Sequence, residues 1–219
     1  MMLFSLLLST VFCPSVQAGY PVMDLHLSLL ALLSLLPSLS QAASVMTKSG
    51  EVRGGTSQFQ GLERTGTLHT FQGIPYAEPP TGRLRLLAPV PVRRWEGSLD
   101  VSGEPRSQCL QPSPHSEEIL GDEDCLFLNI YTETLPQSSA HIHHLRPVFF
   151  WIHGGSFKIG SGTFKGMNMD LLVESGLVVV TINYRLGPLG FLALPGTEIS
   201  GNQGLKARVY ILPRNPYNS

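Results

Sequence analysis

The segment Pro147-Val-Phe-Phe-Trp-Ile-His-Gly-Gly-Ser-Phe157 determines how this chain is interpreted. Residues 147–152 are apolar at successive positions, which is typical of an interior strand of a parallel sheet, buried on both faces. His153 and two glycines follow, and such a turn lets backbone N–H groups at a strand end point at one developing negative oxygen. The segment therefore predicts a strand that leads into an oxyanion-binding turn.

The residues after this turn complete a βαβ pattern. Residues 169–174 have helical character and are followed by Gly176, after which 177–182 form a second continuous apolar run. A strand, a glycine loop, a helix and a second strand in this order favour an α/β fold.

The part of the chain before residue 147 is richer in turns. Short β-prone pieces between glycines in 47–70 predict small antiparallel strands. The prolines of 71–80 predict an extended segment, since they exclude a helix there. Residues 89–114 are expected to form a loop anchored by Trp95, and 125–131 another strand.

Composition limits the classes of partner. The chain has 219 residues, 15 Lys and Arg against 16 Asp and Glu, and a net charge of −1. This length suits one core or two small ones, and the balanced charge does not favour nucleic acid or an acidic membrane surface. The 22 glycines and 17 prolines predict many turns.

The N-terminus carries two apolar runs, 3–16 and 25–39, each followed by small residues. Both resemble the apolar part of a secretory signal, although neither has positive residues before it. A membrane anchor is the alternative, but it needs roughly 20 uninterrupted apolar residues, and Asp24 and Pro37 interrupt the tract. We expect 1–43 to be signal-like, the location to be the secretory pathway or outside the cell, and any membrane contact to be through this segment.

Beyond that segment the chain has two cysteines, Cys109 and Cys125. In an oxidising compartment an even pair predicts one disulfide, and two free thiols in a reducing compartment are the alternative. Zinc binding is not favoured, because no second Cys or His stands at zinc-like spacing beside either residue. His141-Ile-His-His144 and the acidic run 117–124 are interpreted as solvated loops, so the sequence predicts no metal site and no cofactor.

Five segments, in order, resemble the successive N-terminal blocks of the type-B carboxylesterases, a family that includes the cholinesterases. They are 71–80, 123–129, 153–157, 182–191 and 201–206. The resemblance covers about 45–206. It implies the N-terminal portion of an α/β-hydrolase fold: a small antiparallel region and then the start of a mostly parallel central sheet.

The resemblance also implies a site and a reaction. Cys109 is expected to pair with Cys125, and the amides of Gly155 and Ser156, behind Gly154, to be two donors of an oxyanion hole. Many members have a third glycine where this chain has Ser156, whose side chain would narrow the pocket while keeping its N–H. The family hydrolyses small carboxylic esters through an acyl-serine intermediate and needs no cofactor.

The nucleophile of that reaction is not found in this sequence. No Gly-x-Ser-x-Gly segment occurs, and the acidic residue and histidine of the family follow later than residue 219 would allow. After Lys206 the resemblance ends. We therefore expect 44–206 to be a partial carboxylesterase domain and 207–219 an unrelated tail, with no catalytic residue and no activity.

Several of these residues also have alternative interpretations. Ser156 begins like a nucleophile turn but has Lys158 in place of the second glycine. Ser161 is better explained as a loop residue, and His153 as a buried histidine that fixes the glycine turn than as a general base. Arg185 is expected to pair with a carboxylate near the sheet. A non-catalytic adhesion module, or a hydrolase with a non-standard nucleophile, are alternative functions.

The sequence also makes an expectation about the sheet edge. If the sheet ends at 177–182, the apolar run 178–182 exposes unpaired amides, a pattern linked to aggregation and to retention in the secretory pathway. The sequence does not set the oligomeric state.

Overall fold

The computed structural model describes residues 42–136, 145–163, 166 and 168–211. All of them belong to one unit, Ser40–Ser219. No helix within these described ranges is both long and apolar enough to cross a membrane. The expectations for 1–41, for His141–His144 and for 212–219 concern residues outside the described ranges.

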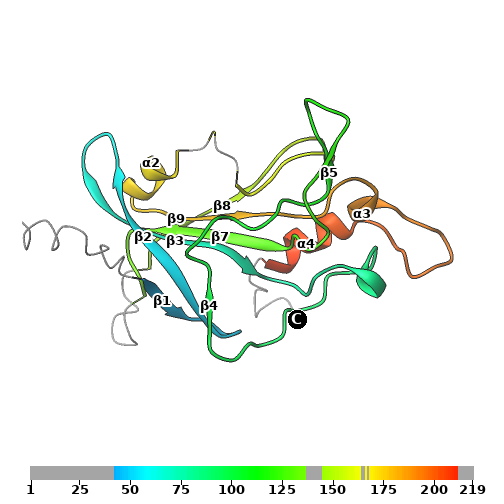
Figure 1. Ribbon diagram of the computed structural model, residues 1–219, viewed down its shortest axis with the longest axis horizontal. Helices are drawn as coiled ribbons and strands as arrows, with labels where there is room; N and C mark the ends of the chain where they lie inside the picture. The colour runs from blue at the N-terminus through cyan, green and yellow to red at the C-terminus, as the bar shows by residue number, and fades with distance from the viewer. Residues whose placement is uncertain (1–41, 137–144, 164–165, 167, 212–219) are drawn as a thin grey trace, which may run out of the picture. The chain divides into compact units, whose positions relative to one another are not determined.

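A seven-stranded sheet forms the centre of this unit (Figure 1). Its main path has the order β1-β2-β3-β7-β9-β8, and β4 pairs with β2. The strands are β1 (Ala43–Met46), β2 (Glu51–Gln60), β3 (Thr65–Pro75), β4 (Ser98–Asp100), β7 (Phe127–Thr132), β8 (Val148–Ile152) and β9 (Val178–Ile182).

The direction of the strands changes along the sheet. From β1 to β9 every neighbouring pair in the main path is antiparallel. The pair β8 and β9 is parallel, with Val148 opposite Val178 and Ile152 opposite Ile182. The antiparallel region predicted for 47–70 and the βαβ unit predicted for 147–182 are both confirmed. Off the main path, β4 also pairs with β2 in parallel. The described chain is therefore a partial α/β domain with a mixed sheet.

The expectation that 178–182 forms an exposed edge is wrong. Strand β9 lies between β7 and β8, and Val179 and Ile182 are 0% exposed. After β8 the chain passes through helix α2 (Met169–Glu174) and then enters the sheet between β7 and β8. Strand β8 is therefore the edge of the described sheet. Val148 is accordingly 60% exposed and Phe149 39%, so 147–152 is not the interior strand that its apolar composition predicted.

The remaining elements are short and lie outside the main sheet. They are η1 (Gly82–Leu84), the hairpin of β5 (Gln111–Pro112) and β6 (Ile119–Leu120), α3 (Gly187–Phe191) and α4 (Gln203–Ile211). Asn168 caps the N-terminus of α2: its side chain accepts the Asp170 N–H at 3.1 Å. Helix α4 continues without a break through Lys206 and Ala207.

Three apolar clusters form the core. One lies around the cysteines and includes Tyr184, Leu186 and Ala207. A second joins β1, β2 and β3 through Val52 and Phe71, and the half-buried Trp95 packs on it. Trp95 also donates its indole N–H to the Glu51 carbonyl at 2.8 Å, so it anchors its loop as expected. The third cluster packs α2 on the sheet.

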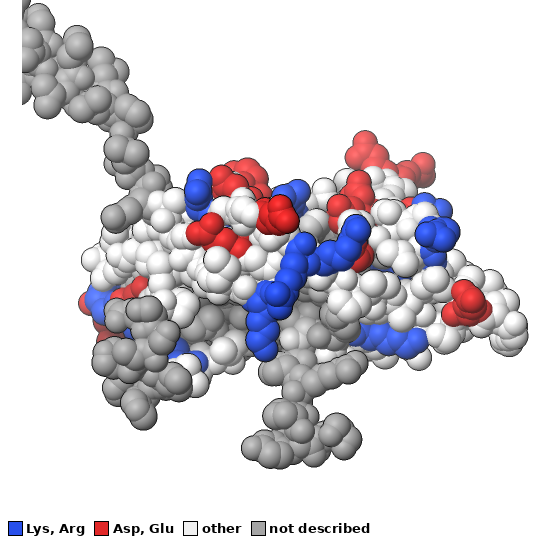
Figure 2. Space-filling model, turned by 90° about the horizontal axis from the view of Figure 1, so that it is seen from below, with Lys and Arg blue, Asp and Glu red and all other residues white. Residues whose placement is uncertain are grey.

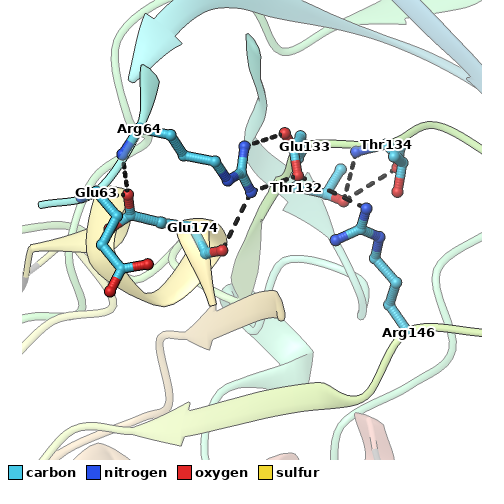
Figure 3. Close-up of polar contacts among 7 residues, drawn as sticks. All are labelled: Glu63, Arg64, Thr132, Glu133, Thr134, Arg146 and Glu174. Atoms are coloured by element: carbon cyan, nitrogen blue, oxygen red, sulfur yellow. Dashed lines mark hydrogen bonds and ion pairs between the residues drawn. The ribbon is translucent and has the colours of Figure 1, made fainter. Parts of the chain in front are cut away.

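Charged side chains tie α2 to the β2–β3 turn at the surface (Figure 3). The Glu174 carboxylate accepts the backbone N–H groups of Leu62, Glu63 and Arg64 at 2.8–2.9 Å. Arg64 donates to the Glu133 carboxylate at 2.6 Å and to the Glu174 carbonyl at 3.1 Å. One arginine therefore connects the hairpin turn, the end of α2 and the residue after β7.

The surface carries charges of both signs. Figure 2 shows acidic and basic side chains on the same face, in keeping with the net charge of −1.

Candidate functional site

The turn after β8 has an unusual backbone conformation. Gly155, Ser156 and Phe157 have φ values of 113°, 54° and 61°, all in the region that side chains disfavour. At Gly155 a Cβ atom would lie 1.9 Å from the Ile159 carbonyl oxygen, so only glycine fits there. The Gly155 carbonyl accepts the N–H groups of Lys158 and Ile159 at 3.0 and 3.1 Å, which closes the turn.

This turn presents two backbone donors to its surroundings. Gly154, Gly155 and Ser156 are exposed. Within the described ranges, no protein acceptor is recorded for the N–H of Gly155 or of Ser156. Successive free N–H groups at a strand end are the arrangement that can bind one oxyanion.

Side chains from distant parts of the chain hold the loop that follows. Gln111 accepts the Gly160 N–H at 2.7 Å, and its amide nitrogen donates to the Gly160 carbonyl at 2.8 Å. Asn183 accepts the Gly162 N–H at 2.8 Å. No local sequence pattern points to Gln111 or Asn183, because each bonds to a loop far along the chain.

His153 is buried, with 4% of its surface exposed. Its Nδ1 lies 2.9 Å from the Gly154 carbonyl, and its ring stacks on Tyr184 at a centroid distance of 4.3 Å. Burial lowers the pKa of His153. These contacts support the interpretation of His153 as a residue that fixes the turn.

No serine near the turn has a base beside it among the described residues. The Ser156 hydroxyl has no recorded hydrogen bond in the part of the chain that the structure covers. The Ser161 hydroxyl contacts Thr163 Oγ1 at 2.7 Å and Asn183 Oδ1 at 3.4 Å, which suits a loop residue. A nucleophile requires an adjacent base or a lowered pKa, so neither serine has the surroundings of one.

The cysteines form the disulfide Cys109–Cys125, and both are buried. Gln111, which holds Gly160, also donates to the Cys109 carbonyl at 2.9 Å. The disulfide region and the loop after the glycine turn are thereby connected. In the described ranges no group of three His, Cys, Asp or Glu side chains could hold a metal ion.

Arg185 is buried beside this disulfide. It is 3% exposed and lines a small cavity with Cys109, Cys125 and Leu186. Burial lowers the pKa of its guanidinium. None of its three side-chain nitrogens has a hydrogen-bond partner among the described residues, so the carboxylate expected for it is not found there.

Comparisons with known proteins agree with one another. The model of the family described as "Carboxylesterase family" matches residues 41–210. The chain is 38% identical to venom carboxylesterase-6 of Apis mellifera over 172 residues, 76% of this chain and 29% of the relative. It is 40% identical to esterase E4 of Myzus persicae over 176 residues, which are 80% of this chain and 31% of the relative.

A bacterial enzyme gives the same result in sequence and in structure. Para-nitrobenzyl esterase of Bacillus subtilis (strain 168) is 38% identical over 169 residues, 74% of this chain and 32% of the enzyme. A solved structure of a PNB esterase superposes with a TM-score of 0.60 at 36% identity, covering 76% of this chain and 32% of that one. The chain therefore spans about a third of the length of these relatives. By its sequence and its partial α/β-hydrolase fold, this chain belongs to the carboxylesterase family.

Proposed function

We propose that residues 153–157 form the oxyanion-binding turn of a carboxylic ester hydrolase. The backbone N–H groups of Gly155 and Ser156 donate to the oxygen that becomes negative when the ester carbonyl is attacked. The observation that carries this proposal is a pair of exposed donors without a recorded internal acceptor, in a turn that only glycine can form at Gly155. Losing one such donor typically costs about 10²–10³ in rate.

The substrate class is a small carboxylic ester. The relatives are named as carboxylesterases and a para-nitrobenzyl esterase, and the family reaction passes through an acyl-serine intermediate. Compared with a glycine, the Ser156 side chain would narrow access to the bound oxyanion, while its backbone N–H would still stabilise it.

A polypeptide limited to these 219 residues is not expected to turn over esters. The printed sequence has no Gly-x-Ser-x-Gly segment, and the described serines near the turn lack a base. An oxyanion turn stabilises a transition state only when a nucleophile can reach the acyl carbon. An adhesion role has no observation in its favour.

The test of inactivity uses the 219-residue polypeptide with p-nitrophenyl acetate and with a fluorophosphonate probe. We expect no saturable turnover and no labelled serine. Covalent labelling of any serine in the folded protein contradicts this part of the proposal.

The test of the turn uses a hybrid in which this chain replaces the aligned third of the Bacillus subtilis esterase. In the hybrid, Gly155→Ala should displace the turn and lower kcat about 10²–10³-fold. Ser156→Gly keeps both N–H groups and serves as the control, with kcat close to that of the unchanged hybrid. Equal kcat values for the two variants would contradict the assignment.

We also propose that 1–43 directs the chain into the secretory pathway, that 44–206 is a partial carboxylesterase domain and that 207–219 is a distinct tail. The apolar runs support the first point, together with a disulfide of the kind formed in oxidising compartments. N-terminal sequencing of protein expressed in a secretory host tests it: an intact Met1 in the product argues against a cleaved signal.

A further inference from the structure

Arg208 of α4 occupies an unusual place beside the turn. Its Cζ lies 4.1 Å from the centroid of the Tyr184 ring and 5.0 Å from that of Phe157, both within cation–π range. Its Nε and Nη2 are buried and have no hydrogen-bond acceptor among the described residues. In the described structure, aromatic faces and not a carboxylate hold this guanidinium.

One ring, that of Phe157, belongs to the end of the proposed oxyanion turn, and the other, that of Tyr184, packs on His153 at its start. Tyr184 stacks on His153 and donates its hydroxyl to the His153 carbonyl at 2.9 Å, so it holds the residue that begins the turn. Phe157 directly follows Ser156. Its carbonyl accepts the Gly187 N–H at 2.8 Å and its ring packs on Phe191 at 5.0 Å. Arg208 thus contacts the end of the turn directly at Phe157, and its start through Tyr184.

The turn needs such support. Ser156 and Phe157 have φ values of 54° and 61°, which residues with side chains adopt only when their surroundings hold them there. Phe157 is also 48% exposed, so burial in a core does not fix it. We infer that Arg208 is a positioning residue that clamps Phe157 to Tyr184 and so keeps the N–H groups of Gly155 and Ser156 aimed outward. Its importance for catalysis depends on the proposed function, but its effect on the turn does not.

Arginine suits this place better than lysine would. A planar guanidinium can lie against aromatic faces, whereas an ammonium is a compact and strongly hydrated point charge. Arg208 also lies in the tail proposed for 207–219. Ala207, which precedes it, is 0% exposed in the cluster that contains Tyr184. The first residues of this tail, Ala207 and Arg208, therefore pack on the domain beside the turn.

The test is NMR spectroscopy of the 219-residue chain carrying Arg208→Met, Arg208→Lys or the control Arg83→Met. Arg83 is exposed in η1, so its variant removes the same charge far along the chain. In R208M we expect the amide resonances of Gly155 and Ser156 to shift. The Ile159 and Gly187 N–H groups donate to the Gly155 and Phe157 carbonyls of the turn. Their hydrogen exchange should accelerate about tenfold or more.

The pKa of His153 distinguishes the loss of the Arg208 contacts from the loss of its charge. Removing the nearby cation in R208M should raise the pKa of His153, whereas R208K keeps the charge and should shift the turn amides without raising this pKa. R83M should change neither. Unchanged turn amides in folded R208M overturn the inference, whether or not the His153 pKa changes.

A second variant keeps the inference testable if R208M does not fold. Phe157→Leu removes the other half of the clamp from an exposed position and should shift the same resonances as R208K. Combining F157L with R208K should then add little, because one contact is lost in either case. Additive shifts overturn the inference. The ester assays are independent of these spectra, so failure of the proposed function is seen separately.

Discussion

At Gly155 the turn can form only because the residue has a hydrogen atom in place of a Cβ. With φ at 113°, a Cβ there would lie 1.9 Å from the Ile159 carbonyl oxygen. The neighbouring Gly154 is different, because a Cβ added to it would meet nothing within 4 Å. Two adjacent glycines therefore have unequal importance, and the sequence alone shows only that both are glycine.

We predict that Gly155→Ala destabilises the chain by roughly 1–3 kcal/mol, the usual range for a side chain forced into a disfavoured backbone conformation. Gly154→Ala should change stability by less than about 0.5 kcal/mol, as substitutions in open surface positions usually do. Urea unfolding of the two variants measures both values. Equal unfolding free energies for the two variants would show that the turn relaxes without cost.

At the scale of elements, α2 is attached to the β2–β3 hairpin by two carboxylates, Asp170, which accepts the Gln60 N–H at 3.2 Å, and Glu174, which makes more contacts. Glu174 accepts three backbone N–H groups, and Arg64 continues the connection to Glu133 (Figure 3). Hydrogen bonds from the backbone of Arg64 and Leu62 lower the pKa of Glu174. A hydrogen bond from the Arg64 side chain likewise lowers the pKa of Glu133.

The hydrogen bonds of the Glu174 carboxylate should weaken in acid. Because the folded pKa of Glu174 lies below the unfolded value of about 4.3, its contribution is present above pH 4.3 and is lost as the pH falls through the folded pKa. We predict that Glu174→Gln lowers stability at pH 7 and flattens the loss of stability below about pH 4.3. The urea midpoint, measured from pH 7 to pH 3, follows both effects.

Glu117→Gln provides the matched control. Glu117 is exposed and has no recorded hydrogen bond or ion pair in the described ranges, so its variant should follow the wild-type pH curve. If E174Q and E117Q give the same curve, the carboxylate of Glu174 does not contribute to the attachment of α2.

At the scale of the whole molecule, the sheet of the described chain has an apolar edge. Strand β8 pairs with β9 on one side, and in the described ranges no strand pairs with its other side. Val148 and Phe149 are 60% and 39% exposed on this strand. Unpaired backbone groups beside apolar side chains are a template for association between chains.

We predict that Val148→Lys reduces concentration-dependent association of the 219-residue chain, since a charge at a sheet edge opposes pairing with another chain. Ile119→Lys is the control, because Ile119 is 67% exposed but lies in the separate β5–β6 hairpin. Sedimentation velocity over a range of concentrations compares the two. An equal reduction by both variants would attribute the effect to net charge and not to the β8 edge.

Local patterns predicted the local elements of this chain. The alternation and length of apolar runs indicated β7, β8, α2 and β9, and the glycines after His153 indicated the turn. Each of these depends on residues within one turn or one strand, where side-chain size and backbone preference act directly. The pairing of Cys109 with Cys125 was implied by the family resemblance, and the structure contains it.

The tertiary structure alone decided which partner each element meets. The sequence determined that 178–182 is an apolar strand. The crossover through α2 then placed this strand, β9, between β7 and β8, so that β8 lies at the edge of the described sheet. No local pattern in the sequence showed that Gln111 and Asn183 bond to the loop after the glycine turn, or that Arg208 lies against Phe157 and Tyr184. Contacts between residues far apart in sequence arise only when the whole sheet is assembled, because packing and not local preference selects them.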